Sequence, residues 1–412
     1  MKPNTLSLIL SALLTYFATM LGVEAVVPPP DGAYPNFTTA EGRNALQSLT
    51  TGAANTALGA YSLFSNTTAS FNTAVGAGAL DLNTGDSNTA VGVAALLLNT
   101  GTENTAGGVD ALGLNTAGES NAAVGAFALY NNIVGDQNIA FGDSALFQNI
   151  HATDNTAIGH NALLNNDSSG NGTAAFNTAV GAGALATNGV GSMNTAVGVN
   201  ALASNLESGL TAIGTEALLS NIGGIQNTAV GTQALFHNIT DGDNTALGWR
   251  ALLNNDSSGN GNANGNSAIG SQALLMNIEG ESANAIGALA LVNNTTGNRN
   301  QAMGVNALHN NADGSFNIAV GHGALASNLH GDGNTAIGNF AGTNLTSFSN
   351  TLIGAGAGSA LTTGSNNICI GFGISGVAGE RRGVGETRQR IEAVAGASMR
   401  SNQTMKPTTL IK

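Results

Sequence analysis

The sequence predicts an all-β fold, a repetitive parallel β-solenoid of about 20 coils over residues 38–376. The motif Asn-Thr-Ala-Val/Ile-Gly returns every 16 or 17 residues up to Asn367, after a degenerate first copy at Thr38. Within each unit, Leu follows four residues after the Gly and Asn seven residues after it. The 412 residues include 58 Gly, and only 8% are charged and 4% aromatic. This composition has too few large side chains for an ordinary globular core. Each unit is therefore expected to form one coil of a solenoid.

The motif itself has the pattern of a short strand. In Asn72-Thr73-Ala74-Val75-Gly76, alternation places Thr73 and Val75 on one face and Ala74 on the other. β-Branched Thr and Val suit a strand, and the small Ala suits a thin interior. We expect successive coils to stack these strands in parallel, and the two Asn of each unit to bond to backbone or to the next coil. The Ala-Leu segment is compatible with a second short strand or with a helical turn.

Two coils are longer than the others. Their step is 22 residues, and both carry the insertion Asn-Asn-Asp-Ser-Ser-Gly-Asn-Gly, at 165–172 and at 254–261. Insertions at one place in the unit indicate loops on one face, and we predict any local ligand contact there, with Asp167 and Asp256 as candidates.

The two ends differ from the repeats. Residues 1–25 have Lys2, an apolar stretch and a small-residue cleavage site, which predicts a secretory signal peptide, with a membrane anchor as the alternative. Residues 26–37 form a Pro-rich linker, and 377–412 a basic tail that we expect to be disordered or to reflect an altered reading frame. Electrostatic attachment of this tail to an acidic cell envelope is the alternative. Cys369 is the single cysteine and stands at the Ala position of its repeat, which predicts a buried small residue.

Charge argues against two kinds of partner. Residues 26–376 hold 20 acidic residues against three arginines, a net charge of −17. Such a surface cannot neutralise phosphates, so nucleic acid and anionic lipid are disfavoured. After signal cleavage we expect no membrane insertion.

Residues that carry chemistry are scattered. The six histidines lie at different phases of the repeat, without metal-ligand spacing, so no metal site is predicted. Aspartates near the anchors lack the fixed phase of calcium-binding nonapeptides, and glycine-rich 354–358 lacks the Lys-Ser/Thr of a phosphate loop. Each insertion offers one acid, whereas glycan hydrolysis uses two. We expect no catalytic residue, no cofactor and no enzyme activity.

Trp249 and Arg250 follow Gly248 directly, ahead of the second insertion. A lone Trp on a polar surface is a candidate sugar-stacking platform, and an incidental structural role is the alternative. The two residues join Asp167 and Asp256 as candidate ligand contacts.

The pattern Asn-Thr-Ala-Val-Gly-x-x-Ala-Leu resembles the YadA-like head domain of trimeric autotransporter adhesins, over about residues 38–376. The unit here is a variant with a longer coil, and we expect no stalk or membrane anchor of its own. The resemblance implies a left-handed β-roll, a homotrimer, and display on a bacterial cell surface for binding host or matrix components.

The function expected from these observations is a secreted or surface-exposed, non-catalytic, adhesin-like rod. Its partners would be two further copies of the chain and a glycan or matrix protein. The alternatives are a fibre segment of a phage-tail-like device, a surface-layer or matrix component, an ice-binding protein with an interrupted Thr ladder, and a carbohydrate-active enzyme.

Overall fold

The computed structural model describes residues 35–374 and 391–393, and the chain divides into two compact units between Asn177 and Thr178. The predicted signal peptide, most of the predicted linker and the tail outside 391–393 lie beyond the described residues. One short 3-10 helix, η1 (Pro35–Phe37), precedes the first strand, and the remaining regular structure of the described ranges is β. The predicted all-β parallel solenoid is confirmed.

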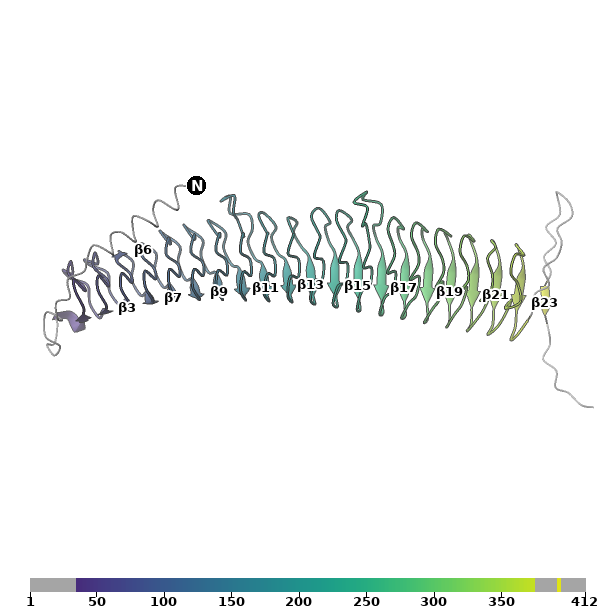
Figure 1. The fold of residues 1–412 in the computed structure, drawn as a ribbon, viewed down its shortest axis with the longest axis horizontal. Coiled ribbons are helices and arrows are strands. Elements are labelled where there is room, and N and C mark those ends of the chain that lie inside the picture. The colour runs from purple at the N-terminus through teal and green to yellow at the C-terminus, as the bar shows by residue number, and fades with distance from the viewer. Residues whose placement is uncertain (1–34, 375–390, 394–412) are drawn as a thin grey trace, which may run out of the picture. The chain divides into compact units, whose positions relative to one another are not determined.

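The first unit stacks eight short strands in parallel, with equivalent residues of the motif in register (Figure 1). Thr56, Ala57 and Leu58 thus lie beside Thr73, Ala74 and Val75 of the next coil. A separate pair of two-residue strands, β4 (Leu82–Asn83) and β6 (Leu98–Asn99), forms on another side of two coils. The eight stacked strands are β1 (Thr39–Glu41), β2 (Thr56–Leu58), β3 (Thr73–Val75), β5 (Thr89–Val91), β7 (Thr105–Gly107), β8 (Ala122–Val124), β9 (Ile139–Phe141) and β10 (Thr156–Ile158).

The second unit repeats the same arrangement. Twelve strands up to β22 pair in parallel and in register, and β23 pairs with β22. Within the described residues, these twelve and the eight of the first unit match the predicted repeats one to one. They are β11 (Thr178–Val180), β12 (Thr195–Val197), β13 (Thr211–Ile213), β14 (Thr228–Val230), β15 (Thr245–Leu247), β16 (Ser267–Ile269), β17 (Asn284–Ile286), β18 (Gln301–Met303), β19 (Ile318–Val320), β20 (Thr335–Ile337), β21 (Thr351–Ile353), β22 (Ile368–Ile370) and β23 (Ile391–Ala393).

Small residues fill the interior of each coil. Ala74 of the strand and Ala79 and Leu80 of the following turn are fully buried, whereas Thr73 and Val75 point outward and are partly exposed. The strand alternation predicted from the motif is confirmed. Because the interior holds one large side chain per coil, its shape depends on close backbone stacking.

Two buried asparagine columns hold the coils together. Asn72 Oδ1 accepts the N–H of Asn88 in the next coil at 2.9 Å, and Asn99 Nδ2 donates to Asn83 Oδ1 at 2.8 Å. Asn88 and Asn99 also donate to the carbonyl of Gly101, at 3.0 and 2.8 Å. Buried polar groups need such partners, so the expected role of both asparagines is confirmed.

The sequence is compatible with a strand or a helical turn in the segment after the motif Gly, and outside β4 and β6 the segment is neither. It is an irregular turn in which the Leu adopts left-handed backbone angles, as Leu80 does at φ 51°. Both sequence interpretations missed this because Leu rarely adopts positive φ. Burial of the Leu side chain in every such turn offsets the backbone strain.

One position shows how the interior tolerates substitution. Cys369 occupies the Ala position and is buried, as expected. Leu352 stands at the same position one coil earlier, and its methyl groups occupy the space beside Gly342 and Gly358, which replace the usual Leu. The large and small residues have exchanged places, so the volume of the interior is kept.

Candidate binding site at the second insertion

The first insertion is fixed by its aspartate. Asp167 is fully buried, and its carboxylate accepts the N–H of His151 at 2.8 Å and that of Gly172 at 2.9 Å. One oxygen therefore binds the preceding coil and the other closes the loop on itself. Ala152, next to His151, is also fully buried.

The second insertion repeats this device and adds to it. Asp256 is fully buried and accepts the N–H of Thr240 at 2.7 Å, the Thr240 hydroxyl at 2.8 Å and the N–H of Gly261 at 3.2 Å. The structure therefore places both predicted contact residues, Asp167 and Asp256, beneath their loops, where their carboxylates bind backbone.

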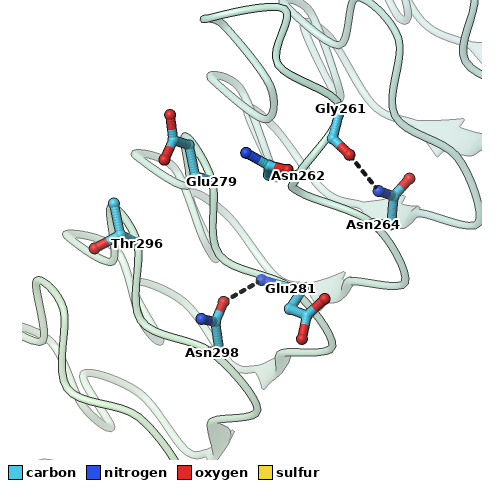
Figure 2. Close-up of a pocket in the computed structure, with 7 residues that line it drawn as sticks. All are labelled: Gly261, Asn262, Asn264, Glu279, Glu281, Thr296 and Asn298. Atoms are coloured by element: carbon cyan, nitrogen blue, oxygen red, sulfur yellow. Dashed lines mark hydrogen bonds between the residues drawn. The ribbon is translucent and has the colours of Figure 1, made fainter.

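A groove of about 390 Å³ lies beside the second insertion and is lined almost wholly by polar groups (Figure 2). Gly261, Asn262 and Asn264 come from the insertion coil, and Glu279, Glu281, Thr296 and Asn298 come from the next two coils. Figure 2 shows Asn264 bonded to the carbonyl of Gly261 and Asn298 bonded to the N–H of Glu281, both at 2.8 Å. The amides are thus held in place while the two carboxylates stay near the surface.

The carboxylates of the groove have weak local partners. Arg299 Nη2 lies 3.1 Å from Glu281 Oε1, and Asn260 donates to Glu279 Oε1 at 2.6 Å. Exposed pairs of this kind contribute little to stability. They leave a groove with acceptor oxygens and amide groups, which suits a hydroxyl-rich or cationic ligand.

A second carboxylate lies beneath this insertion. Asp241 is fully buried, and its Oδ2 accepts the N–H of Ala263 at 2.5 Å, whereas its Oδ1 accepts no hydrogen bond. Burial is the main cause that raises the pKa of Asp241 to about 6. The Ala263 bond and the Asn264 amide lower this pKa, and the Asp256 charge raises it further. Asp241 is the group of this site with the least satisfied charge.

Trp249 and Arg250 lie together at the turn after β15. The Arg250 guanidinium carbon stands 4.7 Å from the centre of the Trp249 ring, and Nε donates to Gln233 at 2.7 Å. The Trp side chain is 46% exposed, so one candidate contact pair is presented to solvent with one ring face occupied by Arg. The site residues predicted from sequence are therefore split between an exposed pair and two buried carboxylates.

Sequence reasoning missed Asp241 and the groove residues, although a signal existed. Aligning the two insertion coils gives Ala152 opposite Asp241, and Thr173 and Ala175 opposite Asn262 and Asn264. The octapeptide is identical in the two loops, so it shows only what they have in common. The differences around it mark where the second loop departs from a structural role.

The outward face of the strands is a second candidate surface. In the second unit its Val position is aliphatic or Met in every coil from Val180 to Ile370, and Ile213, Leu247 and Met303 are 41%, 46% and 50% exposed. In the first unit Glu41 and Gly107 interrupt the column. A continuous apolar strip that is at least partly exposed in every coil marks an interaction surface.

Within residues 35–374 and 391–393, no group of three or more His, Cys, Asp and Glu side chains is placed to hold a metal ion. Over the same residues, no helix has the length and apolar character needed to span a bilayer. No protein-family model matches the chain, and no curated protein is similar to it.

Proposed function

We propose that the chain is a secreted or bacterial cell-surface, adhesin-like structural protein without catalytic activity, which acts as a homotrimer. The observation that carries the proposal is the aliphatic column on the outward face of β11–β22. An unbroken apolar strip along twelve coils would be costly to leave in water, and burying it between copies removes that cost. The strict register of the repeats supplies each copy with a matching surface.

Attachment would rest on many equivalent weak contacts. A repeated surface presents the same groups at every coil, so the binding of one segment raises the effective concentration of the next. The polar groove beside the second insertion is the place for a glycan contact, because its amides and carboxylates match the hydroxyl groups of sugars.

The test is the mass of the secreted protein by light scattering, for the wild type and for two single variants of the second unit. Ile286→Glu places a charge in the aliphatic column, and we expect it to convert a trimer into monomer. Ser271→Glu adds the same charge at an exposed turn one coil earlier and should leave the trimer intact. A monomeric wild type at micromolar concentration overturns the trimer, and a trimer insensitive to Ile286→Glu overturns the strand face as its interface.

Ligand binding needs its own measurement. The secreted protein is applied to an array of glycans and matrix proteins, beside Asn262→Ala and Glu279→Gln variants. A glycan that the wild type retains, and that both variants bind at least tenfold more weakly, supports the groove as the binding site. A tenfold loss of affinity corresponds to about 1.4 kcal/mol of binding free energy. No retained glycan or matrix protein contradicts the adhesive role.

A further inference from the structure

We propose that the second insertion holds a divalent cation, with Ca²⁺ the best match, between Asp241 and the hydroxyl of Thr240, with the buried charge of Asp256 beside them. This site is independent of the proposed adhesive function. It follows from the way one loop differs from its otherwise matching copy.

One carboxylate oxygen of Asp241 has no hydrogen-bond partner. Asp241 is fully buried and its Oδ1 has no hydrogen-bond donor, while its other oxygen is fixed by Ala263. A buried carboxylate oxygen without a partner is costly unless a cation or a proton compensates it. Asp256 beside it is also buried and adds to the negative charge.

This oxygen faces an open space beside Gly261. A methyl group built on Gly261 would lie 3.7 Å from Asp241 Oδ1 and 3.6 Å from Thr240 Oγ1, with no closer heavy atom. Two oxygens from neighbouring residues thus converge on one opening next to the loop. Gly261 also lines the polar groove, so the opening has access to water for the remaining ligands.

The protein groups at this opening are both oxygen ligands. Carboxylate and hydroxyl oxygens are hard ligands, which Ca²⁺ accepts in flexible arrangements of six to eight that include water. Mg²⁺ requires a stricter octahedral geometry and gives up water reluctantly, so a site on a loop favours Ca²⁺. The absence of sulfur and imidazole from this donor set disfavours zinc.

The first insertion is a natural control. There Ala152 replaces Asp241 and His151 replaces Thr240, and a methyl group built on Gly172 would meet only His151 atoms. Asp167 has the same two backbone bonds as its counterpart, so the loop closes without the additional carboxylate. The second carboxylate is therefore not needed to form the loop.

The test is calorimetric titration of the full secreted protein with CaCl₂ after treatment with chelator, beside MgCl₂. We expect about one Ca²⁺ site per chain with a Kd on the order of 10⁻⁴ M, in the range of extracellular modules. Asp241→Asn keeps the shape of the side chain and should weaken this site at least about tenfold. Asp313→Asn, an exposed aspartate elsewhere in the second unit, should not change it.

A variant that gains a Ca²⁺ site distinguishes specific binding from a general attraction of cations to the acidic protein. His151→Thr with Ala152→Asp gives the first insertion the donors of the second, and we expect a second Ca²⁺ site in that variant. Wild-type protein that binds no Ca²⁺ up to millimolar concentration overturns the proposal. So does an Asp241→Asn protein that binds as wild type. The mass of the protein, measured separately, decides the trimer without bearing on this site.

Discussion

The two insertions share eight residues and differ in what surrounds them. In both, the aspartate is buried and binds one N–H of the preceding coil and one N–H of its own loop. Beside the first loop lie exposed His151 and buried Ala152, and beside the second lie exposed Thr240 and buried Asp241. Identical residues thus build the loop, and different residues decide whether it has a charged interior.

The difference between the two insertions separates residues that form the coil from residues that are candidates for function. A residue that recurs in every copy is explained by the coil itself, as the motif Gly, the Asn columns and the insertion aspartates are. A residue that differs between two otherwise matching copies needs another explanation. Asp241, in place of Ala, is such a residue, and it lies under the loop that carries the polar groove.

The largest expected effect tests the shared scaffold. Gly142→Ala, in the coil before the first insertion, and Gly248→Ala, in the coil that carries the second insertion, should each destabilise the local stack by at least about 3 kcal/mol. Both glycines have strongly positive φ, and an added Cβ would lie 2.5 and 2.6 Å from the carbonyl oxygen of the next motif Gly. Native-state hydrogen exchange measures the loss locally, because long repeat arrays do not unfold in one step.

Gly209→Ala is the matched control for these variants. Its φ is also positive, at 75°, but an added Cβ would have no atom within 4 Å. We expect it to cost only about 1–2 kcal/mol, the penalty of left-handed backbone alone. Equal costs at all three sites would show that the stacking of coils does not restrict these glycines.

The next effect tests whether the insertion aspartates are equivalent. Asp167→Ala and Asp256→Ala should each reduce the local free energy of unfolding by about 2–3 kcal/mol, because each leaves partly buried N–H groups without their charged acceptor. Hydrogen exchange at His151 and Gly172, and at Thr240 and Gly261, reports the two losses. A large loss at one loop and none at the other would break the parallel between them.

A smaller effect depends on pH and should separate the loops. The pKa of Asp241 is raised to about 6 in the fold, so the folded state binds more protons than the unfolded chain between about pH 4 and 6. Stability of the second loop is therefore full below about pH 4 and is lost as pH rises through 6. We expect a fall on the order of 1–2 kcal/mol in chelator, after allowance for solvent screening.

Asp241→Asn should remove this pH dependence from the second loop. Burial also raises the pKa of Asp81 to about 6 and that of Asp110 above its ordinary value, both in the first unit. The comparison is therefore made at amides of the second insertion, with and without the substitution. A pH profile that the substitution does not alter would assign the effect to another group.

The fold could be predicted from the sequence because each coil repeats the same local choices. Asn, Thr, Ala and Gly at fixed spacing determine the strand, its alternation and its stacking, and the copies confirm one another. The turn after the motif could not be predicted, because Leu at positive φ contradicts its local preference and is stabilised only by burial in the stack. The groove depends on Glu279 and Thr296, which lie in different coils from the insertion, so only the register of stacking brings them together.

The smallest effect concerns the exposed turn that precedes each insertion. Trp249 and Arg250 stand where the first insertion coil has His160 and Asn161, and Arg250 and Asn161 both have positive φ. Exchange to Trp249→His with Arg250→Asn loses an exposed cation–π contact worth about 0.5–1 kcal/mol. It gains a residue that tolerates left-handed backbone better than Arg does. We expect these terms to offset and the stability at the turn to change by less than about 0.5 kcal/mol. A loss above about 1.5 kcal/mol would give the Trp a structural role, whereas unchanged stability with weakened retention on glycans would assign Trp249 to ligand contact.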